Sequence, residues 1–155
     1  MLIRDATPAD APAACETMRR SITELCTADH ANDPDILQRW LANKTPENVA
    51  AWITNPNNSV LVATENNAIL AVGAVTNQGE ITLNYVSPDA RFRGISRAML
   101  SALEARARER GNTTCTLTST ETAQRFYETA GYIQTGPSTV KFGTPSYPMT
   151  KELIA

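Results

Sequence analysis

The chain has 155 residues, of which 42% are hydrophobic and 19% charged, with a formal net charge of −2 at pH 7. This length suits one domain, residues 1–155, with a single sizeable core. No stretch reaches the roughly 18 consecutive apolar residues of a membrane span, and the N-terminal segment lacks a signal-peptide pattern, so we expect a cytoplasmic protein without a membrane partner. The slightly acidic balance argues against nucleic acid as a partner.

The first 57 residues predict a compact helical region behind a short strand at 2–5. A helix is expected from Thr7-Pro8 to about Cys26, because apolar side chains recur on one face and threonine followed by proline is typical of a helix start. Asp33-Pro34 and Thr45-Pro46 mark two further helix starts. The tryptophans behind them are expected to pack in this helical layer.

Apolar, β-branched runs then alternate with short polar turns. Ser59–Thr64, Ala68–Thr76 and Glu80–Val86 predict three antiparallel strands, since the connections are too short for any other pairing. A helix follows from Gly94 to about Arg110, and residues 113–119 form a strand. Because a helix intervenes, that strand should run parallel to the third strand of the meander.

A short helix around Phe126 and two closing strands, near 132–135 and 147–153, complete the chain. With no repeats or linkers, the pattern predicts one mixed α/β domain. The three cysteines, Cys15, Cys26 and Cys115, include no C-x-x-C pair, so neither a disulfide framework nor a metal site is expected. Ordinary burial is the expectation for each of them.

The turn between the strand at 80–86 and the following helix has the character of a phosphate-binding site. The first N–H groups of a helix have no intrahelical partner, and the helix dipole adds partial positive charge there. Gly94 lets a ligand approach the backbone, and Arg91, Arg93 and Arg97 add formal charge. Many α/β proteins have such a turn as mere architecture, so this feature alone leaves both interpretations open.

Two motifs in this part of the chain resemble those of the GNAT acetyltransferases. Arg91-Phe-Arg-Gly94-Ile-Ser96 matches the acetyl-CoA motif Q/R-x-x-G-x-G/A, with serine in place of the last small residue. Ala123-Gln-Arg-Phe126-Tyr127, continuing to Gly131-Tyr132, matches A-x-x-F-Y-x-x-x-G-F/Y. Thr120 stands where the family often has asparagine. The resemblance covers about residues 59–136 closely and extends loosely to both ends.

The resemblance implies the GNAT fold: a mixed, mostly antiparallel central sheet that splays between strands 4 and 5, with helices on both faces. It also implies acetyl-CoA as co-substrate, lying in the splay, with backbone groups near Tyr85–Val86 holding pantetheine and polarising the thioester. The N–H groups of Phe92 to Ser96 would hold the pyrophosphate. The implied cofactor-binding residues are Tyr85, Val86, Arg91, Phe92, Arg93, Gly94, Ile95, Ser96, Arg97, Thr120, Ala123 and Phe126.

Two residues are candidates for catalysis. Tyr127 stands where the family often has a tyrosine that protonates the departing thiolate; the plainer interpretation is a core aromatic like its neighbour Phe126. Glu80 occupies the position of the general-base glutamate in the histone-acetylating branch, and an attacking amine must lose its proton. The plainer interpretation is a surface carboxylate at a strand end.

The acceptor is expected to be a small, cationic amine. Its site is predicted on the far side of the splay from the phosphates, walled by the segment Thr27–Lys44 and the loop Gly136–Pro148. Asp29, His30 and Trp40 are the candidate contacts, with Asp33 and Asp35 close by. A solvated or helix-capping role for His30, and packing for Trp40, are the alternatives.

The sequence as a whole predicts an acetyl-CoA-dependent N-acetyltransferase that works by direct transfer in a ternary complex. One alternative keeps the fold and discards catalysis, giving an acyl-CoA-binding sensor or interaction module. Another is a nucleotide-dependent enzyme, against which the absence of a G-x-x-x-x-G-K-[ST] loop weighs. The general base (Glu80, His30 or water) and a homodimer are left open.

Overall fold

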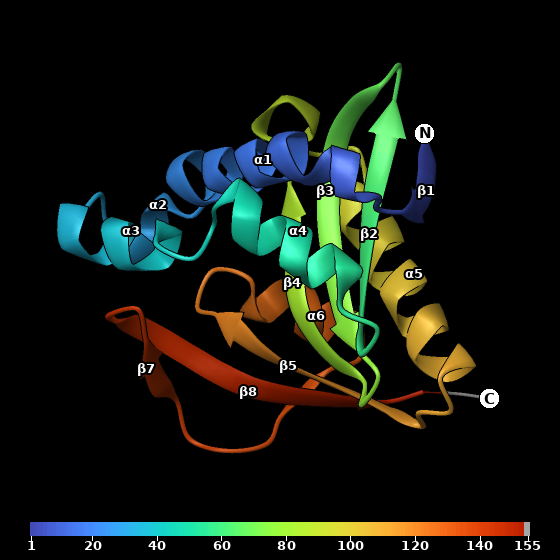
Figure 1. The fold of residues 1–155 in the computed structure, drawn as a ribbon. Helices are drawn as coiled ribbons and strands as arrows, with labels where there is room; N and C mark the ends of the chain where they lie inside the picture. Colours follow the sequence, from blue (N-terminus) through green and yellow to red (C-terminus); the bar gives the residue numbers. More distant parts are fainter. Residues whose placement is uncertain (154–155) are drawn as a thin grey trace.

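A computed structural model describes residues 1–153 (Figure 1). The elements in chain order are β1 (Leu2–Asp5), the 3₁₀ turn η1 (Pro8–Asp10), α1 (Ala11–Leu25), α2 (Thr27–His30), α3 (Pro34–Leu41), α4 (Pro46–Thr54), β2 (Asn58–Glu65), β3 (Ala68–Thr76), β4 (Glu80–Val86), the 3₁₀ turn η2 (Pro88–Ala90), α5 (Ile95–Glu109), β5 (Thr114–Thr120), α6 (Gln124–Thr129), β6 (Ile133–Gln134), β7 (Thr139–Lys141) and β8 (Thr144–Glu152).

The strands form one sheet in the order β1-β2-β3-β4-β5-β8-β6, with β7 also pairing with β8. Every pairing is antiparallel except that of β4 with β5, which is parallel. The helix α5 makes the crossover between these two strands. The predicted mixed, mostly antiparallel sheet is therefore confirmed.

Helices cover both faces of this sheet, as expected (Figure 1). On one face α1 and α4 pack on β2, β3 and β4 around side chains such as Met18, Val62 and Leu83. On the other, α5 and α6 enclose a second cluster that includes Met99, Leu103 and Tyr127. Because each strand alternates its side chains between the two faces, the central strands β2 and β3 are buried on both sides.

The sheet splits where β4 meets β5. Only Glu80 and Ile81 of β4 pair with β5, opposite Thr116 and Leu117. Beyond Ile81 the two parallel strands diverge, so the remaining length of β4 faces a gap instead of a neighbouring strand. This is the predicted splay, and we call the space between the strands the wedge.

A β-bulge lies at the point where the wedge begins. Ala74 of β3 pairs with Leu83 and Val75 pairs with Ile81, which leaves Thr82 unpaired. The extra residue reverses the alternation of side chains along β4. Ile81 consequently packs with the α5–α6 cluster, whereas Leu83, two residues later, packs with the α1–α4 cluster.

Three features differ from the sequence-based expectation. The first helix is preceded by the 3₁₀ turn η1, in which Thr7 and Asp10 form a capping box. Thr27–His30 form a short helix where a loop was expected. The strand β7 was not predicted; it forms a hairpin with β8, which begins at Thr144 and not at Tyr147.

Candidate active site

The wedge contains a hollow of about 180 Å³ between the diverging strands. Its walls come from Leu83 to Val86 on one side and Leu117 to Thr120 on the other, and the end of α1 closes it with Leu25 and Cys26. Tyr127, from α6, lines the hollow as well. The motif that begins at Ala123 therefore lies beside β4, the strand that leads into the motif beginning at Arg91.

Tyr127 is 8% exposed, and its hydroxyl accepts a hydrogen bond from Asn84 Nδ2 at 3.4 Å. Burial raises the pKa of the phenol, so the hydroxyl keeps its proton at neutral pH. Within residues 1–153, Asn84 Oδ1 is buried and has no hydrogen-bond partner. An unpaired buried carbonyl is unfavourable by about 1–3 kcal/mol, and a ligand N–H in the wedge would remove this penalty.

The edge of β4 that faces the wedge carries free backbone groups. Ser87 N donates to Leu70 O, toward β3. Since successive residues of a strand turn their N–H and C=O groups to opposite sides, the groups of Asn84 and Val86 point to the wedge. Tyr85 and Val86, the residues expected near pantetheine, both line the hollow, and by the same alternation the backbone groups of Tyr85 point to β3.

The turn after β4 leads into the N-terminus of α5. Ser87 Oγ accepts from Asp89 N and caps η2, and Gly94 is the N-cap residue of α5. Gly94 has φ +75°, and a Cβ at this position would meet no atom within 4 Å. The backbone at the start of α5 is therefore open to a ligand, with the N–H groups of Ile95, Ser96 and Arg97 unpaired within the helix.

The three arginines near this turn have different surroundings. Arg93 pairs with Glu65 at 2.8 Å, which offsets part of its charge. The Arg91 guanidinium lies 4.5 Å from the ring centroid of Phe92, a residue with φ +62° whose surface is 91% exposed. Arg97 lies in the first turn of α5.

The other predicted cofactor residues lie at the start of α6. Thr120 Oγ1 accepts from Ala123 N at 3.2 Å, and both residues line the wedge hollow. Phe126 packs edge-on against Tyr127, with ring centroids 5.1 Å apart, and is not among the residues that line the hollow. Phe126 thus holds the Tyr127 ring in position from the core side.

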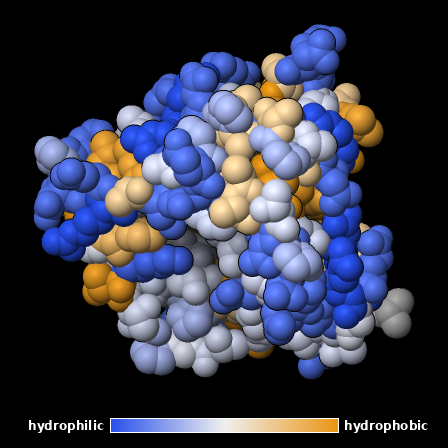
Figure 2. All heavy atoms as spheres, viewed as in Figure 1, coloured by the Kyte–Doolittle hydropathy of each residue, from blue (hydrophilic) through white to orange (hydrophobic). Residues whose placement is uncertain are grey.

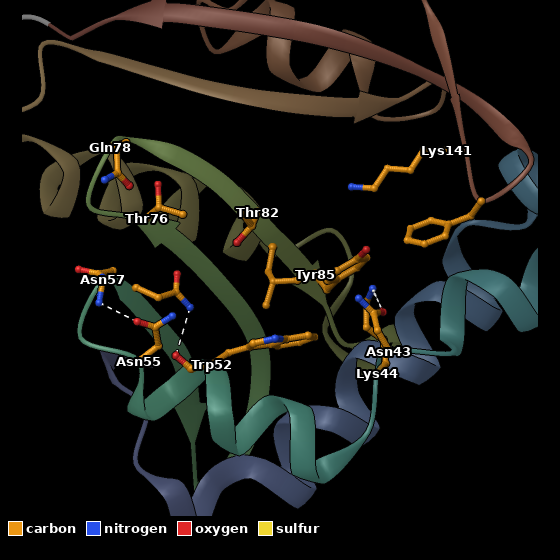
Figure 3. A pocket seen from close by; sticks show the side chains of 13 residues that line it. Asn43, Lys44, Trp52, Asn55, Asn57, Thr76, Gln78, Thr82, Tyr85 and Lys141 are labelled. Atoms are coloured by element: carbon orange, nitrogen blue, oxygen red, sulfur yellow. Dashed lines mark hydrogen bonds between the residues drawn. The ribbon is translucent and has the colours of Figure 1, made fainter.

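A larger hollow of about 450 Å³ opens on the α1–α4 face of the sheet, and we call it the acceptor hollow (Figures 2 and 3). Thr82, Leu83 and Tyr85 line both this hollow and the wedge, so the two meet at the bulge. Its other walls come from the α3–α4 connection, α4, the α4–β2 and β3–β4 connections and the β7–β8 turn. The remaining lining residues are Asn43, Lys44, Trp52, Asn55, Asn57, Asn58, Thr76, Gln78, Lys141 and Phe142.

Tyr85 lies at the junction. Its hydroxyl accepts from Trp40 Nε1 at 3.1 Å, and burial raises the pKa of the phenol. Trp40 in turn stacks on Phe142, with ring centroids 6.4 Å apart and 15° between the planes. Trp40 lines the wedge and a small third hollow of about 70 Å³ beside it, and is not among the residues that line the acceptor hollow, where it was expected.

Asp29 and His30 do not lie in the acceptor hollow, contrary to expectation. His30 is fully buried: Asn32 N donates to Nδ1, which places the proton on Nε2, and Nε2 donates to Ile22 O at 2.9 Å. Asp29 accepts from Thr122 N and, through its carbonyl, from Thr144 Oγ1. Both residues tie α2 to its neighbours, because the short helix turns them inward.

Glu80 is exposed and is not among the residues that line the wedge or the acceptor hollow. Its N–H donates to Thr76 Oγ1, and Thr76 does line the acceptor hollow. Because Ile81 packs on the α5–α6 side, alternation directs the Glu80 side chain to the acceptor side. Glu80 therefore stands at the rim of the acceptor hollow.

Sequence reasoning missed Asn84, the bulge at Thr82 and both lysines of the acceptor hollow. A polar asparagine in an apolar strand was a usable signal for the first. Lys44 and Lys141 belong to the two segments that were expected to wall the acceptor site, Thr27–Lys44 and Gly136–Pro148, but neither lysine was singled out. Among residues 1–153, no helix is long and apolar enough to cross a membrane, and no three His, Cys, Asp or Glu side chains are grouped to hold a metal ion.

These features define a transferase of the acetyltransferase class. A family model described as an acetyltransferase (GNAT) domain matches residues 26–153, and the chain belongs to this family. The expected GNAT membership and acetyltransferase activity are thereby confirmed. A search of curated proteins found no match.

Solved structures share the fold over nearly the whole chain. A GCN5-related N-acetyltransferase from Rhodopseudomonas palustris is 24% identical, with a TM-score of 0.87 and coverage of 98% of this chain and 95% of that one. A ribosomal-protein-alanine N-acetyltransferase from Brucella melitensis is 26% identical, with a TM-score of 0.75 and coverage of 99% and 100%. The PaiA N-acetyltransferase from Thermoplasma acidophilum, solved with coenzyme A, is 18% identical, with a TM-score of 0.80 and coverage of 97% and 98%.

Proposed function

We propose that this acetyltransferase moves an acetyl group from acetyl-CoA directly onto the amine of a small-molecule acceptor. The observation that carries the proposal is the position of the Tyr127 hydroxyl in the wedge, bonded to Asn84 at the open edge of β4, the strand whose neighbouring residues Leu83 and Tyr85 also line a second hollow. The wedge suits acetyl-CoA, and the acceptor hollow suits the amine. An arrangement of this kind lets two substrates meet from opposite sides of the sheet.

The residues present fit acetyl-CoA in three respects. The start of α5 is open at Gly94 for a pyrophosphate. The free backbone groups of Asn84 and Val86 can pair with the amides of pantetheine as a neighbouring strand would. The unpaired Asn84 Oδ1 can accept from an amide N–H in the same place.

Acetyl-CoA supplies an activated acetyl group as a thioester. In the transfer, the bond from the acetyl carbon to the amine nitrogen forms and the bond to sulfur breaks. The amine loses one proton and the sulfur gains one. We propose that Tyr127 donates the proton that the sulfur gains, since burial raises the pKa of its hydroxyl and keeps it protonated at neutral pH. We propose that Glu80 accepts the proton that the amine loses, through a water molecule at the rim of the acceptor hollow.

Cys26 supports direct transfer over a covalent acyl-enzyme. Among the described cysteines it is the one that lines the wedge, and burial raises its pKa to about 12. A thiol with this pKa carries almost no thiolate at neutral pH, and the thiolate is the nucleophile. Cys26 therefore serves as a wall of the wedge.

The test is acetyl transfer by the purified protein. Acetyl-CoA is supplied with a panel of small amines and with peptides, thiol release is followed over time, and each product is identified by mass spectrometry. Turnover with small amines that falls in Tyr127→Phe supports the proposal. Acetyl-CoA binding in calorimetry without turnover on any acceptor would favour the non-catalytic sensor, and turnover on peptides alone would refute the small-molecule acceptor.

A further inference from the structure

The acceptor hollow is rich in nitrogen donors and lacks carboxylates. Two of the three lysines in the chain, Lys44 and Lys141, line it. No aspartate or glutamate is among the described residues that line this hollow, the wedge or the small hollow between them. Glu80 stands at the rim, outside the lining; within the lining a cationic acceptor would find no carboxylate among the described residues, whereas an anionic acceptor would find two lysines.

Both ammonium groups gather at one end of the hollow, around the ring of Phe142. The Nζ atoms of Lys44 and Lys141 each lie 5.5 Å from the ring centroid. Figure 3 shows the Lys141 side chain extending from the β7–β8 turn toward Tyr85 and Thr82, with Lys44 on the other side of Tyr85. The two positive charges therefore flank the place where the acceptor hollow meets the wedge.

Neither ammonium group has a carboxylate partner in the part of the chain that the structure describes. No ion pair joins Lys44 or Lys141 to a carboxylate within residues 1–153; Lys44 Nζ donates to Asn43 Oδ1 at 2.8 Å. Lys44 is 4% exposed, and burial together with the charge of Lys141 lowers its pKa to about 8. Charged side chains are almost never this deeply buried without a partner, so the site lacks a negative charge that a ligand can supply.

The turn that presents Lys141 is held in a strained form. Lys141 pairs with Thr144 across a two-residue turn in which Phe142 has φ +54° and Gly143 has φ +84°. Positive φ is unfavourable for a bulky residue such as phenylalanine, and such strain persists where the surroundings impose it. Stacking on Trp40 holds Phe142 there and fixes the position of Lys141 beside it.

The acids near α2 and α3 do not offer a competing site for a cation. Asp33 caps α3 by accepting from Asp35 N, and Asp35 pairs with Arg39 at 3.2 Å. Asp29 Oδ1 accepts from Thr122 N at the start of α6; its Oδ2 is buried without a hydrogen-bond partner within residues 1–153, but Asp29 lines none of the three hollows. The cationic acceptor expected from the sequence therefore lacks the partners that were predicted for it.

We propose that the acceptor amine carries a carboxylate, which Lys44 and Lys141 bind together while the amine reaches the wedge between Thr82 and Tyr85. This inference rests on the proposed function and specifies its acceptor class. The opposite end of the hollow is lined by side-chain amides, Asn55, Asn57 and Gln78, which can both donate to and accept from polar groups of the same molecule (Figure 3).

The experiment compares matched acceptors. Amino acids whose carboxylate lies one, two or three carbons from the amine are each paired with the corresponding carboxamide, and thiol release from acetyl-CoA gives kcat and KM. Loss of one charge-assisted contact corresponds to roughly 10–100-fold in affinity. Lys44→Met and Lys141→Met keep the aliphatic stem, and each should raise KM for the carboxylate member by that factor and change KM for the carboxamide little.

Two further variants sharpen the result. Arg110→Met removes one positive charge at the far end of α5 and should leave both kinetic constants unchanged. Lys141→Glu, at an exposed position, should shift the preference from carboxylate-bearing amines to diamines. A carboxamide also alters the pKa of the amine itself. The quantity compared is therefore the ratio of the KM of the variant to the KM of the wild type, taken for each acceptor separately.

The outcomes separate this inference from the proposed function. Turnover on neutral amines and diamines with no preference for a carboxylate overturns the inference and leaves the acetyltransferase intact. If no amine reacts, calorimetry with the same amino acids on the CoA-saturated protein decides: binding that Lys44→Met abolishes supports the carboxylate site without the activity. Absence of both turnover and binding overturns both.

Discussion

Asn84 donates a hydrogen bond to the hydroxyl of Tyr127 across the wedge, at 3.4 Å. The contact joins β4 to α6, two elements that are far apart in the chain. It orients a phenol whose raised pKa keeps it protonated, next to the free edge of the strand that carries the asparagine. The first prediction concerns this hydroxyl.

Tyr127→Phe should lower kcat by about 10²–10⁴-fold, the usual effect of removing a general acid, and leave the affinity for acetyl-CoA nearly unchanged. The matched control is Tyr132→Phe. That ring lies 5.7 Å from Tyr127, but its hydroxyl donates to Glu104 at 2.8 Å, away from the wedge. The control should lose stability and keep its turnover per folded molecule. Equal turnover of Tyr127→Phe and wild type would make Tyr127 a core aromatic only.

Gly94→Ala should weaken acetyl-CoA binding, because its Cβ would enter the space at the start of α5. Gly111 is a close control: it follows the end of the same helix, has φ +87°, and a Cβ at its position would likewise meet no atom within 4 Å. Both variants should unfold more easily, by about 1 kcal/mol, from backbone strain. Calorimetry should show weaker binding only in the first, and similar affinities in the two would remove the phosphates from this turn.

Cys26→Ala should retain turnover within about twofold, since a thiol whose pKa is raised to about 12 cannot supply the nucleophile. The measurement is kcat with saturating acetyl-CoA, together with mass spectrometry of the wild-type protein during turnover. An acetyl group found on Cys26, or a variant that folds and does not turn over, would contradict direct transfer.

Glu80→Gln should remove the acidic limb of the pH–rate profile and lower kcat, because the amide keeps the shape of the side chain but cannot accept a proton. The control is Glu109→Gln, at the exposed end of α5. A profile unchanged from wild type would assign the proton to water or to the acceptor's own ionisation.

Lys44 predicts a pH dependence of stability. Its pKa is lowered to about 8 in the folded protein from 10.5, by burial and by Lys141, while Cys15 acts in the opposite direction. Between these values the unfolded chain binds more protons than the folded one, so the free energy of unfolding should rise with pH across this window, by on the order of 1–2 kcal/mol. Denaturant titrations of wild type and Lys44→Met at pH 7.5 and 10 measure the difference, and parallel pH dependences would show that Lys44 is not perturbed.

Much of the fold could be predicted because its signals are local. The β-meander follows from alternating apolar runs and short turns, and the parallel β4–β5 pair follows from the helix between those strands. The proline-marked starts of α3 and α4 lie where expected, with Asp33 and Thr45 as caps.

The parts that could not be predicted depend on contacts between distant segments. His30 follows a helix in a polar stretch, and only the docking of α2 buries it. The β7–β8 hairpin has an atypical turn, in which a phenylalanine takes a conformation that glycine or asparagine usually adopts. Lys44 lies in the α3–α4 connection and Lys141 at the end of β7, so their shared position depends on how the helical layer packs beside the β7–β8 hairpin.

The bulge at Thr82 reverses the face of the sheet to which each following side chain of β4 points. If Thr82 paired with β3 as in a regular strand, Asn84 would face the acceptor hollow and Tyr85 would face α6, so that Tyr127 would lose its hydrogen-bond partner and Trp40 would lose the hydroxyl that it contacts. Deletion of Thr82 would instead leave Ile81 opposite Val75 and Leu83 opposite Ala74 in a regular ladder, so the side chains on both sides of the bulge would keep their compartments. The pairing register of β4, more than the identity of residue 82, therefore decides which side chains reach the donor compartment and which reach the acceptor compartment.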